Sequence, residues 1–142
     1  MADDISQTGE TLPVDVFFDD LNVLGQVYYA RYPVLVDRGL TVFCERMGLR
    51  LGHEDLNVAV RELTLTYDQP LRKVGSVALT LWVEAVARTS VTFGFRFQTG
   101  DTVHAYGQSV IVKVERGTQH PAPWTETTRE QLTSRMFTGA IA

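Results

Sequence analysis

The feature that most constrains the fold of this sequence is a long stretch, residues 58–114, in which apolar and polar residues alternate. Alternation with a period of two is typical of strands that bury one face. Turn-forming residues divide the stretch into four runs, at about 58–67, 77–87, 91–97 and 103–114. The segment Thr99-Gly100-Asp101, between the last two runs, is typical of a hairpin turn. The sequence therefore predicts four long antiparallel strands.

The first of these runs contains a change of phase. Val58 and Val60 alternate in one phase, whereas Leu63, Leu65 and Tyr67 alternate in the other. One extra residue in a strand of an antiparallel pair has this effect. We therefore expect a β-bulge at residues 61–62.

Before this stretch, between about residues 29 and 47, the apolar residues recur at steps of three and four, which is the period of a helix. The recurring positions are Tyr28, Tyr32, Leu35, Val36, Gly39, Leu40, Phe43 and Met47. Pro33 fits the first turn, where N–H groups have no partner inside the helix. Gly48 is a suitable C-terminal stop. Because the helix is apolar over much of its circumference, we expect the sheet to wrap around it.

The two ends of the chain complete the predicted layout. Residues 1–11 are polar and irregular and predict a flexible N-terminal arm, followed by a single domain over residues 12–142. The domain begins with a short strand over residues 12–18. It ends with a short helix that has Thr125 as its N-cap and buries Leu132, Met136 and Phe137. One helix on a mostly antiparallel sheet is an α+β architecture.

Composition excludes several classes of function. The 142 residues carry 13 Lys and Arg against 17 Asp and Glu, a net charge of −4, which argues against nucleic-acid binding. No apolar run reaches the roughly 20 residues that a membrane helix needs, and the acidic N-terminus is unlike a signal peptide. One cysteine and no zinc-ligand spacing predict no disulfide and no metal. We expect a cytoplasmic protein without cofactors.

A family resemblance is carried by residues 18–32, which read FDDLNVLGQVYYARY. The segment resembles the signature loop of hotdog-fold acyl thioesterases of the 4-hydroxybenzoyl-CoA thioesterase type. The Arg-Thr-Ser opening at residues 88–90 and the last strand over residues 105–114, with the Pro-rich step after it, are also similar to this family. The ordered matches span most of residues 12–125. The resemblance implies the hotdog fold, an antiparallel sheet around one long central helix, and hydrolysis of an acyl thioester.

The resemblance also implies three catalytic positions. The N–H of Tyr29 would face the thioester carbonyl at the positive end of the helix, and Gly25 would let the acyl chain pass close to the loop. Asn22 stands where most of the family carries a catalytic Asp. An amide is no general base, but it can donate to the carbonyl and accept from a water. The alternative for Asn22 is a turn residue that bonds its own backbone.

The general base is unassigned at this stage. The candidate carboxylates are Asp19, Asp20, Asp37 and Glu62, and only a partly desolvated one would be useful. A water held by polar groups, with no strong base, is the alternative. Cys44 lies on the apolar helix face and is expected to be a core thiol.

Five residues are candidates for binding the substrate: Tyr28, Arg61, Arg88, Thr89 and Ser90. Arg61 would suit the phosphates of CoA or the acidic face of a carrier protein. Residues 88–90 would suit pantetheine or phosphate contacts, and a capped hairpin turn is the alternative for them.

The loop is most similar to the enediyne polyketide branch of the family, which also carries Asn at the position of Asn22. That branch has an Arg further along the helix, at the position of Leu40 here. The implied substrate is a fatty or polyketide acyl thioester on an acyl carrier protein or CoA.

Self-association is also expected, because a long exposed sheet edge rarely stays unpaired. By resemblance the protein would be a dimer or tetramer, with Asn22 of one chain facing Arg61 or Ser90 of the other. A non-catalytic protein that binds acyl thioesters is the main alternative function. A hotdog dehydratase ranks third, because residues 27–47 contain no His.

Overall fold

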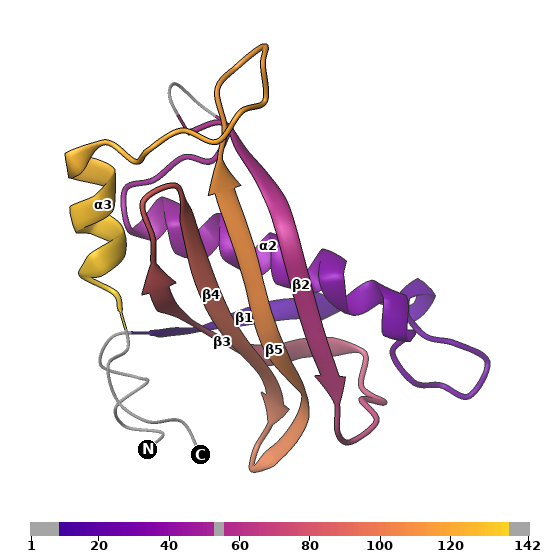
Figure 1. Ribbon diagram of the computed structural model, residues 1–142. Coiled ribbons are helices and arrows are strands. Elements are labelled where there is room, and N and C mark those ends of the chain that lie inside the picture. The colour runs from indigo at the N-terminus through magenta and orange to yellow at the C-terminus, as the bar shows by residue number, and fades with distance from the viewer. Residues whose placement is uncertain (1–8, 53–55, 137–142) are drawn as a thin grey trace.

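The computed structural model describes residues 9–52 and 56–136, and within them five strands surround one long helix (Figure 1). The elements in chain order are β1 (Glu10–Val16), a 3-10 helix (Phe18–Asp20), a second 3-10 helix (Tyr29–Arg31), α2 (Tyr32–Arg46), β2 (Val58–Tyr67), β3 (Gly75–Val86), β4 (Ser90–Thr99), β5 (Thr102–Lys113) and α3 (Glu126–Thr133). Among the described residues, no helix is long and apolar enough to cross a membrane.

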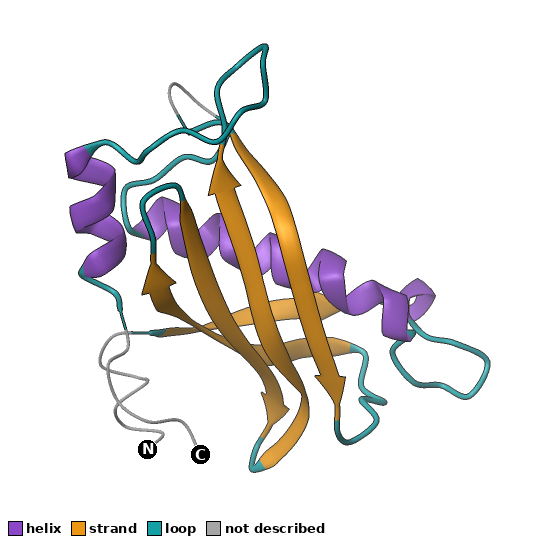
Figure 2. Ribbon diagram, in the orientation of Figure 1, coloured by secondary structure: helices purple, strands orange, loops and turns teal. Residues whose placement is uncertain are grey.

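The strands form one antiparallel sheet in the order β1-β3-β4-β5-β2, which curves around α2 (Figure 2). This arrangement confirms the predicted α+β class and the sheet wrapped around one helix. The bulge predicted in β2 is also confirmed, because the pairing with β5 shifts register between Val60 and Glu62. Strands β1 and β2 are the two edges. Pro13 in β1 is tolerated because proline, which has no N–H, is confined to edge strands and bulges.

Burial of α2 against the inner face of the sheet makes the core. Phe43 lies 6.2 Å from Phe93 between ring centroids, and Tyr32 lies 5.1 Å from Phe97. The N-terminal end of α2 therefore lies over the end of β4, and the C-terminal end of α2 lies over the beginning of β4. Gly39 permits close approach, because a Cβ at this position would collide with the buried Leu79 side chain.

The N-terminal boundary differs from the prediction. Strand β1 begins at Glu10, so the expected arm over residues 1–11 extends too far. The Glu10 carboxylate pairs with Arg46 and Arg135, and the Thr11 hydroxyl lies 2.9 Å from that of Thr80. These partners are distant in sequence. The polar character of residues 10 and 11 therefore did not reveal that they belong to the strand. Residues 1–8 lie outside the described part.

The C-terminal helix is close to its prediction. Thr125 caps α3, because its Oγ1 accepts from the N–H of Thr128 at 3.2 Å. Leu132 is buried and Met136 packs against the core, although α3 itself ends at Thr133. Phe137, which was expected to be buried, lies outside the described residues.

Strand β2 is attached to the sheet through β5 alone, and the two strands approach closely at Gly107. A Cβ at Gly107 would collide with the backbone carbonyl of Thr64 in β2. Three apolar side chains of β2 are exposed at the free edge: Val60 (57%), Leu63 (39%) and Tyr67 (47%). The absence of a side chain at position 107 therefore allows β2 to lie this close to β5.

The close approach at Gly107 gives a stability prediction. Gly107→Ala should lower the free energy of unfolding by about 3 kcal/mol, because backbone cannot move aside as a side-chain end can. Gln108→Ala, at the next and exposed position of β5, is the matched control and should change little. Urea unfolding of both variants measures the difference. Equal stabilities would contradict the predicted contact.

Candidate active site

Asn22 organises the loop that precedes α2. Its backbone N–H donates to the Gln26 carbonyl at 2.7 Å, and its carbonyl accepts from the Gly25 N–H at 3.0 Å. Its side-chain Oδ1 accepts from the N–H groups of Leu24 (2.9 Å) and Gln26 (3.2 Å). The turn-forming role considered for Asn22 is thus present. The Oδ1 atom is occupied twice, whereas Nδ2 donates to no acceptor in the hydrogen bonds found among the described residues.

Gly25 is required here by backbone conformation. Its φ is +73°, in the left-handed region, and a Cβ would meet no atom of the chain within 4 Å. The space around Gly25 therefore does not demand a glycine, but its backbone angle does.

The helix that carries Tyr29 begins without a side-chain cap. The N–H of Tyr28 donates to the Asp20 carbonyl, and the Tyr28 carbonyl accepts from the Arg31 N–H, both at 2.8 Å. The N–H groups of Tyr29 and Ala30 belong to the first turn, and no acceptor among the described residues pairs with either. Tyr29 is 61% exposed. The structure thus presents two adjacent N–H donors at an open helix N-terminus.

Four tyrosines gather at this end of α2. Rings lie in contact between Tyr28 and Tyr29 (4.7 Å between centroids), Tyr29 and Tyr67 (6.4 Å), and Tyr32 and Tyr67 (5.4 Å). From the sequence pattern, Tyr67 is predicted only to lie on a strand face. Its sequence signal, the last apolar position of a strand, does not reveal contact with a helix 38 residues away.

Three of these phenols, Tyr28, Tyr32 and Tyr67, have raised pKa values and therefore hold their protons at neutral pH. Burial, followed by repulsion from Tyr67, raises the pKa of Tyr32 to about 12. Burial and then Tyr29 raise the pKa of Tyr67, and hydrogen bonding to Tyr29 raises the pKa of Tyr28. Tyr28, Tyr32 and Tyr67 can therefore donate hydrogen bonds but offer no base at pH 7.

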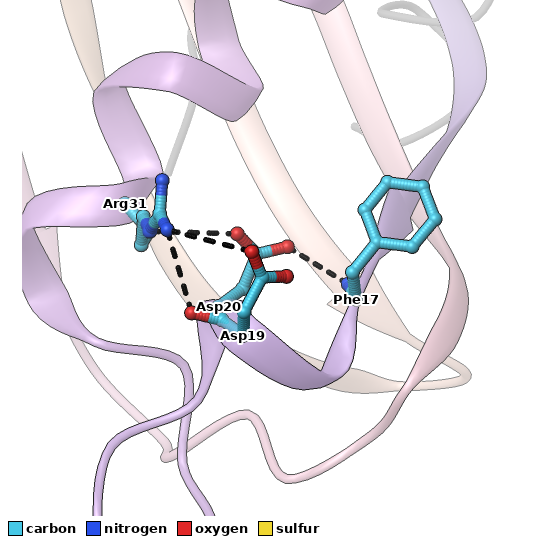
Figure 3. A network of polar contacts seen from close by, with 4 residues as sticks. All are labelled: Phe17, Asp19, Asp20 and Arg31. Atoms are coloured by element: carbon cyan, nitrogen blue, oxygen red, sulfur yellow. Dashed lines mark hydrogen bonds and ion pairs between the residues drawn. The ribbon is translucent and has the colours of Figure 1, made fainter.

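The two aspartates beside the loop pair with one arginine (Figure 3). Asp20 is 5% exposed, its Oδ2 accepts from the Phe17 N–H at 2.8 Å, and its Oδ1 lies 3.5 Å from Nε of Arg31. Asp19 is exposed, and its carboxylate lies 4.0 Å from the same guanidinium. Asp20 therefore stabilises the approach to the helix and is not a free carboxylate.

The other two candidate bases point elsewhere. Asp37 is exposed on the side of α2 away from the sheet, since the buried positions of α2 lie on its opposite side. Glu62 lies opposite Val110, on the face of the sheet away from α2, because the neighbouring Ser109 and Ile111 are buried. Within one chain, neither contributes a base to the helix N-terminus.

The turn between β3 and β4 contains Arg88, Thr89 and Ser90, and Trp124 hydrogen-bonds to its backbone. The carbonyls of Arg88 and Ser90 accept from the backbone and indole N–H of Trp124, both at 3.1 Å. This capped turn matches the alternative considered for the segment. Ser90 begins β4, below the C-terminal end of α2, so one chain does not bring it to Tyr29.

The remaining candidates are placed as follows. Arg61 is exposed at the bulge of edge strand β2. Cys44 is 1% exposed and burial raises its pKa to about 12, as expected of a core thiol. Within residues 9–52 and 56–136, no group of three or more His, Cys, Asp or Glu side chains is arranged to hold a metal ion.

A curved antiparallel sheet around one long helix is the hotdog architecture. The family model of the thioesterase-like superfamily matches residues 16–132. The chain belongs to this superfamily and is therefore classed among the thioester hydrolases. No curated protein sequence matches the chain.

Solved structures share the fold. A 1,4-dihydroxy-2-naphthoyl-CoA thioesterase from Synechocystis is 12% identical, with a TM-score of 0.79 over 88% of this chain and 96% of that one. A DHNA-CoA thioesterase from Staphylococcus aureus is 12% identical, with a TM-score of 0.81 over 88% and 89%. A thioesterase from Thermus thermophilus, complexed with coenzyme A and zinc, is 23% identical, with a TM-score of 0.74 over 88% and 92%. At these identities the likeness shows the fold alone.

The aspartate pair gives a second prediction. Asp20→Ala should lower the free energy of unfolding by about 2 kcal/mol, because the Phe17 N–H and the Arg31 guanidinium lose a buried partner. Asp19→Ala, which touches the same arginine from an exposed position, should leave stability nearly unchanged. Thermal unfolding of the two variants checks this. A larger loss of stability in Asp19→Ala than in Asp20→Ala would contradict the stabilising role given to Asp20.

Proposed function

We propose that this protein hydrolyses a fatty or polyketide acyl thioester, carried on CoA or on an acyl carrier protein, at the N-terminus of the helix that begins at Tyr29. The observation that carries the proposal is the exposed pair of N–H donors at Tyr29 and Ala30, which no side chain caps. Donors that point at a developing oxyanion stabilise it strongly.

In this reaction a water oxygen attacks the thioester carbonyl carbon, and the carbonyl oxygen becomes the oxyanion facing the Tyr29 N–H. The tetrahedral intermediate then collapses and the C–S bond breaks. The proton that the water loses is returned to the leaving thiolate, so the products are a carboxylic acid and a thiol.

Asn22 would contribute through its Nδ2 group. The Oδ1 atom already accepts two backbone N–H groups, so the side chain is fixed with its amide N–H groups left to donate. An amide N–H can donate a hydrogen bond to the substrate carbonyl, but it cannot remove a proton from water. Within one chain no candidate carboxylate is partly desolvated and free: Asp20 is buried and paired, and Asp19 is exposed beside Arg31. Asp37 and Glu62 point away, so the attacking water would be positioned by polar groups. Gly25 supports the same loop through its left-handed backbone.

Two observations bear on the carrier. The named activities of the fold relatives include DHNA-CoA thioesterases, and one relative is complexed with coenzyme A, which favours CoA. Asn22 at the position of the usual Asp resembles the enediyne polyketide branch, which favours a carrier protein. The position of that branch's helix arginine is the buried core residue Leu40 here, so any cation that binds phosphate must come from elsewhere.

The proposal includes a dimer or a tetramer built from dimers. One chain leaves Tyr28 and Tyr29 open to solvent and places Ser90 at the other end of the sheet. The apolar free edge of β2 is a suitable contact surface for a second copy. Arg61 on that edge, with residues 88–90 of the partner chain, would then approach the acyl carrier's phosphate.

The activity prediction uses both asparagines of the chain. Wild type should release thiol from members of a panel of acyl-CoA and acyl-carrier-protein thioesters. Asn22→Ala should reduce kcat/KM by about 10²–10³-fold, through loss of one donor to the oxyanion. Asn57→Ala, just before the start of β2, is the matched control and should retain full activity.

The outcomes separate the functions considered. Binding of thioesters without turnover by wild type would contradict hydrolysis and favour the non-catalytic binding protein. Equal rates in both asparagine variants would keep the hydrolase and remove Asn22 from its chemistry.

The assembly prediction is tested by sedimentation. Wild type should sediment at about twice or four times 15.9 kDa, and Val60→Lys should shift the mass to that of one chain, because a charge would be buried at the β2 edge. The Val60→Lys monomer should also lose turnover. A fully active monomeric wild type would contradict a site shared between chains.

A further inference from the structure

The Tyr29 carbonyl lies in the 3-10 helix that leads into α2, and a side chain from the sheet also reaches it. In a 3-10 helix a carbonyl accepts from the N–H three residues on, which for Tyr29 is that of Tyr32, and Pro33 has no N–H with which to add a bond from the fourth residue. The Tyr67 hydroxyl donates to this carbonyl, with 3.0 Å between the phenol oxygen and the Tyr29 oxygen. A side chain from the sheet edge thus adds a donor to a carbonyl of the first helical turn.

The position of the Tyr67 hydroxyl is fixed from several sides. Its ring makes edge contacts with Tyr29 at 6.4 Å and Tyr32 at 5.4 Å, with interplanar angles of 89° and 69°. Tyr67 pairs with Ala105 in the β2–β5 ladder, and the next N–H, of Asp68, donates to the His104 carbonyl at 2.9 Å. The sheet therefore holds the phenol at a set place relative to the helix.

The hydrogen bond acts on a peptide group that also carries a free donor. The Tyr29 carbonyl and the Ala30 N–H belong to the same peptide unit, so a bond to the carbonyl polarises the N–H. The preceding unit has the same arrangement, because the Tyr28 carbonyl accepts from Arg31, and the Tyr29 N–H has no acceptor among the described residues. Two consecutive peptide groups are thus bonded at their carbonyls and open at their N–H ends.

We propose that Tyr67 is a positioning residue for the hydrolytic site: its hydroxyl orients and polarises the Tyr29–Ala30 peptide group, so that the Ala30 N–H joins the Tyr29 N–H as a second donor to the oxyanion. This inference rests on the proposed function. Burial and the nearby Tyr29 raise the pKa of Tyr67, so the phenol remains a donor through neutral and mildly alkaline pH.

The test compares Tyr67→Phe with Tyr106→Phe. Both remove one phenol oxygen from a half-exposed tyrosine, at 47% and 45% exposure, and Tyr106 lies on the outer face of the neighbouring strand β5. Tyr67→Phe keeps the ring contacts, so its melting temperature should stay close to that of wild type. Its kcat should fall about tenfold, less than the loss of a direct donor, while KM changes by less than about twofold. Tyr106→Phe should match wild type.

A second measurement is independent of turnover. In protein labelled with ¹⁵N-alanine, the Ala30 amide proton should move upfield in Tyr67→Phe and stay in place in Tyr106→Phe, because the peptide group loses its polarising partner. An unmoved Ala30 resonance would overturn the inference.

The kinetic outcomes distinguish a failure of the role of Tyr67 from a failure of the proposed hydrolysis. An active wild type with equal kcat in both variants would overturn the role of Tyr67 alone, as would a loss confined to KM. A wild type that hydrolyses no thioester would overturn the proposed function, and with it the role of Tyr67.

Discussion

The packing of α2 into the curved sheet is the constraint on which the site depends. Gly39 brings the helix against Leu79, and aromatic contacts along β4 fix the direction in which the helix runs. With α2 in this place, its first turn emerges at the end of β4, next to the end of β2. Buried apolar surface far from any reacting atom thus determines where the two N–H groups are displayed.

The candidate site consists mostly of backbone groups. Asn22 uses its side-chain oxygen to bind the loop, and Asp20 uses its carboxylate to bind Phe17 and Arg31. The raised pKa values of Tyr28, Tyr32 and Tyr67 keep their protons in place. What remains for a substrate is a set of N–H donors with partial positive charge. Such a surface stabilises developing negative charge without a strong base, which fits an activated ester better than an amide.

The local sequence pattern predicted most of the helices and strands, but it did not predict contacts between residues far apart in the sequence. Alternation and helical period predicted four strands, the bulge in β2, the long helix and the cap at Thr125, because burial and capping depend on near neighbours. The start of β1 was wrong, because Glu10 is held by Arg46 and Arg135. The loop motif identified residues 22–29 as candidates. The role of Tyr67 could not be predicted from the sequence, because its contact with Tyr29 forms only when β2 is in place in the folded sheet.

Pro13 bears on how the sheet can grow. A proline in β1 lacks a donor that an incoming strand would need, whereas β2 contains no proline along its ten residues. Addition of strands is therefore favoured at one side of the sheet only. When two chains pair through their β2 edges, neither chain has a β2 edge left for a third chain. Association through backbone pairing therefore stops at a dimer and cannot propagate into a fibre.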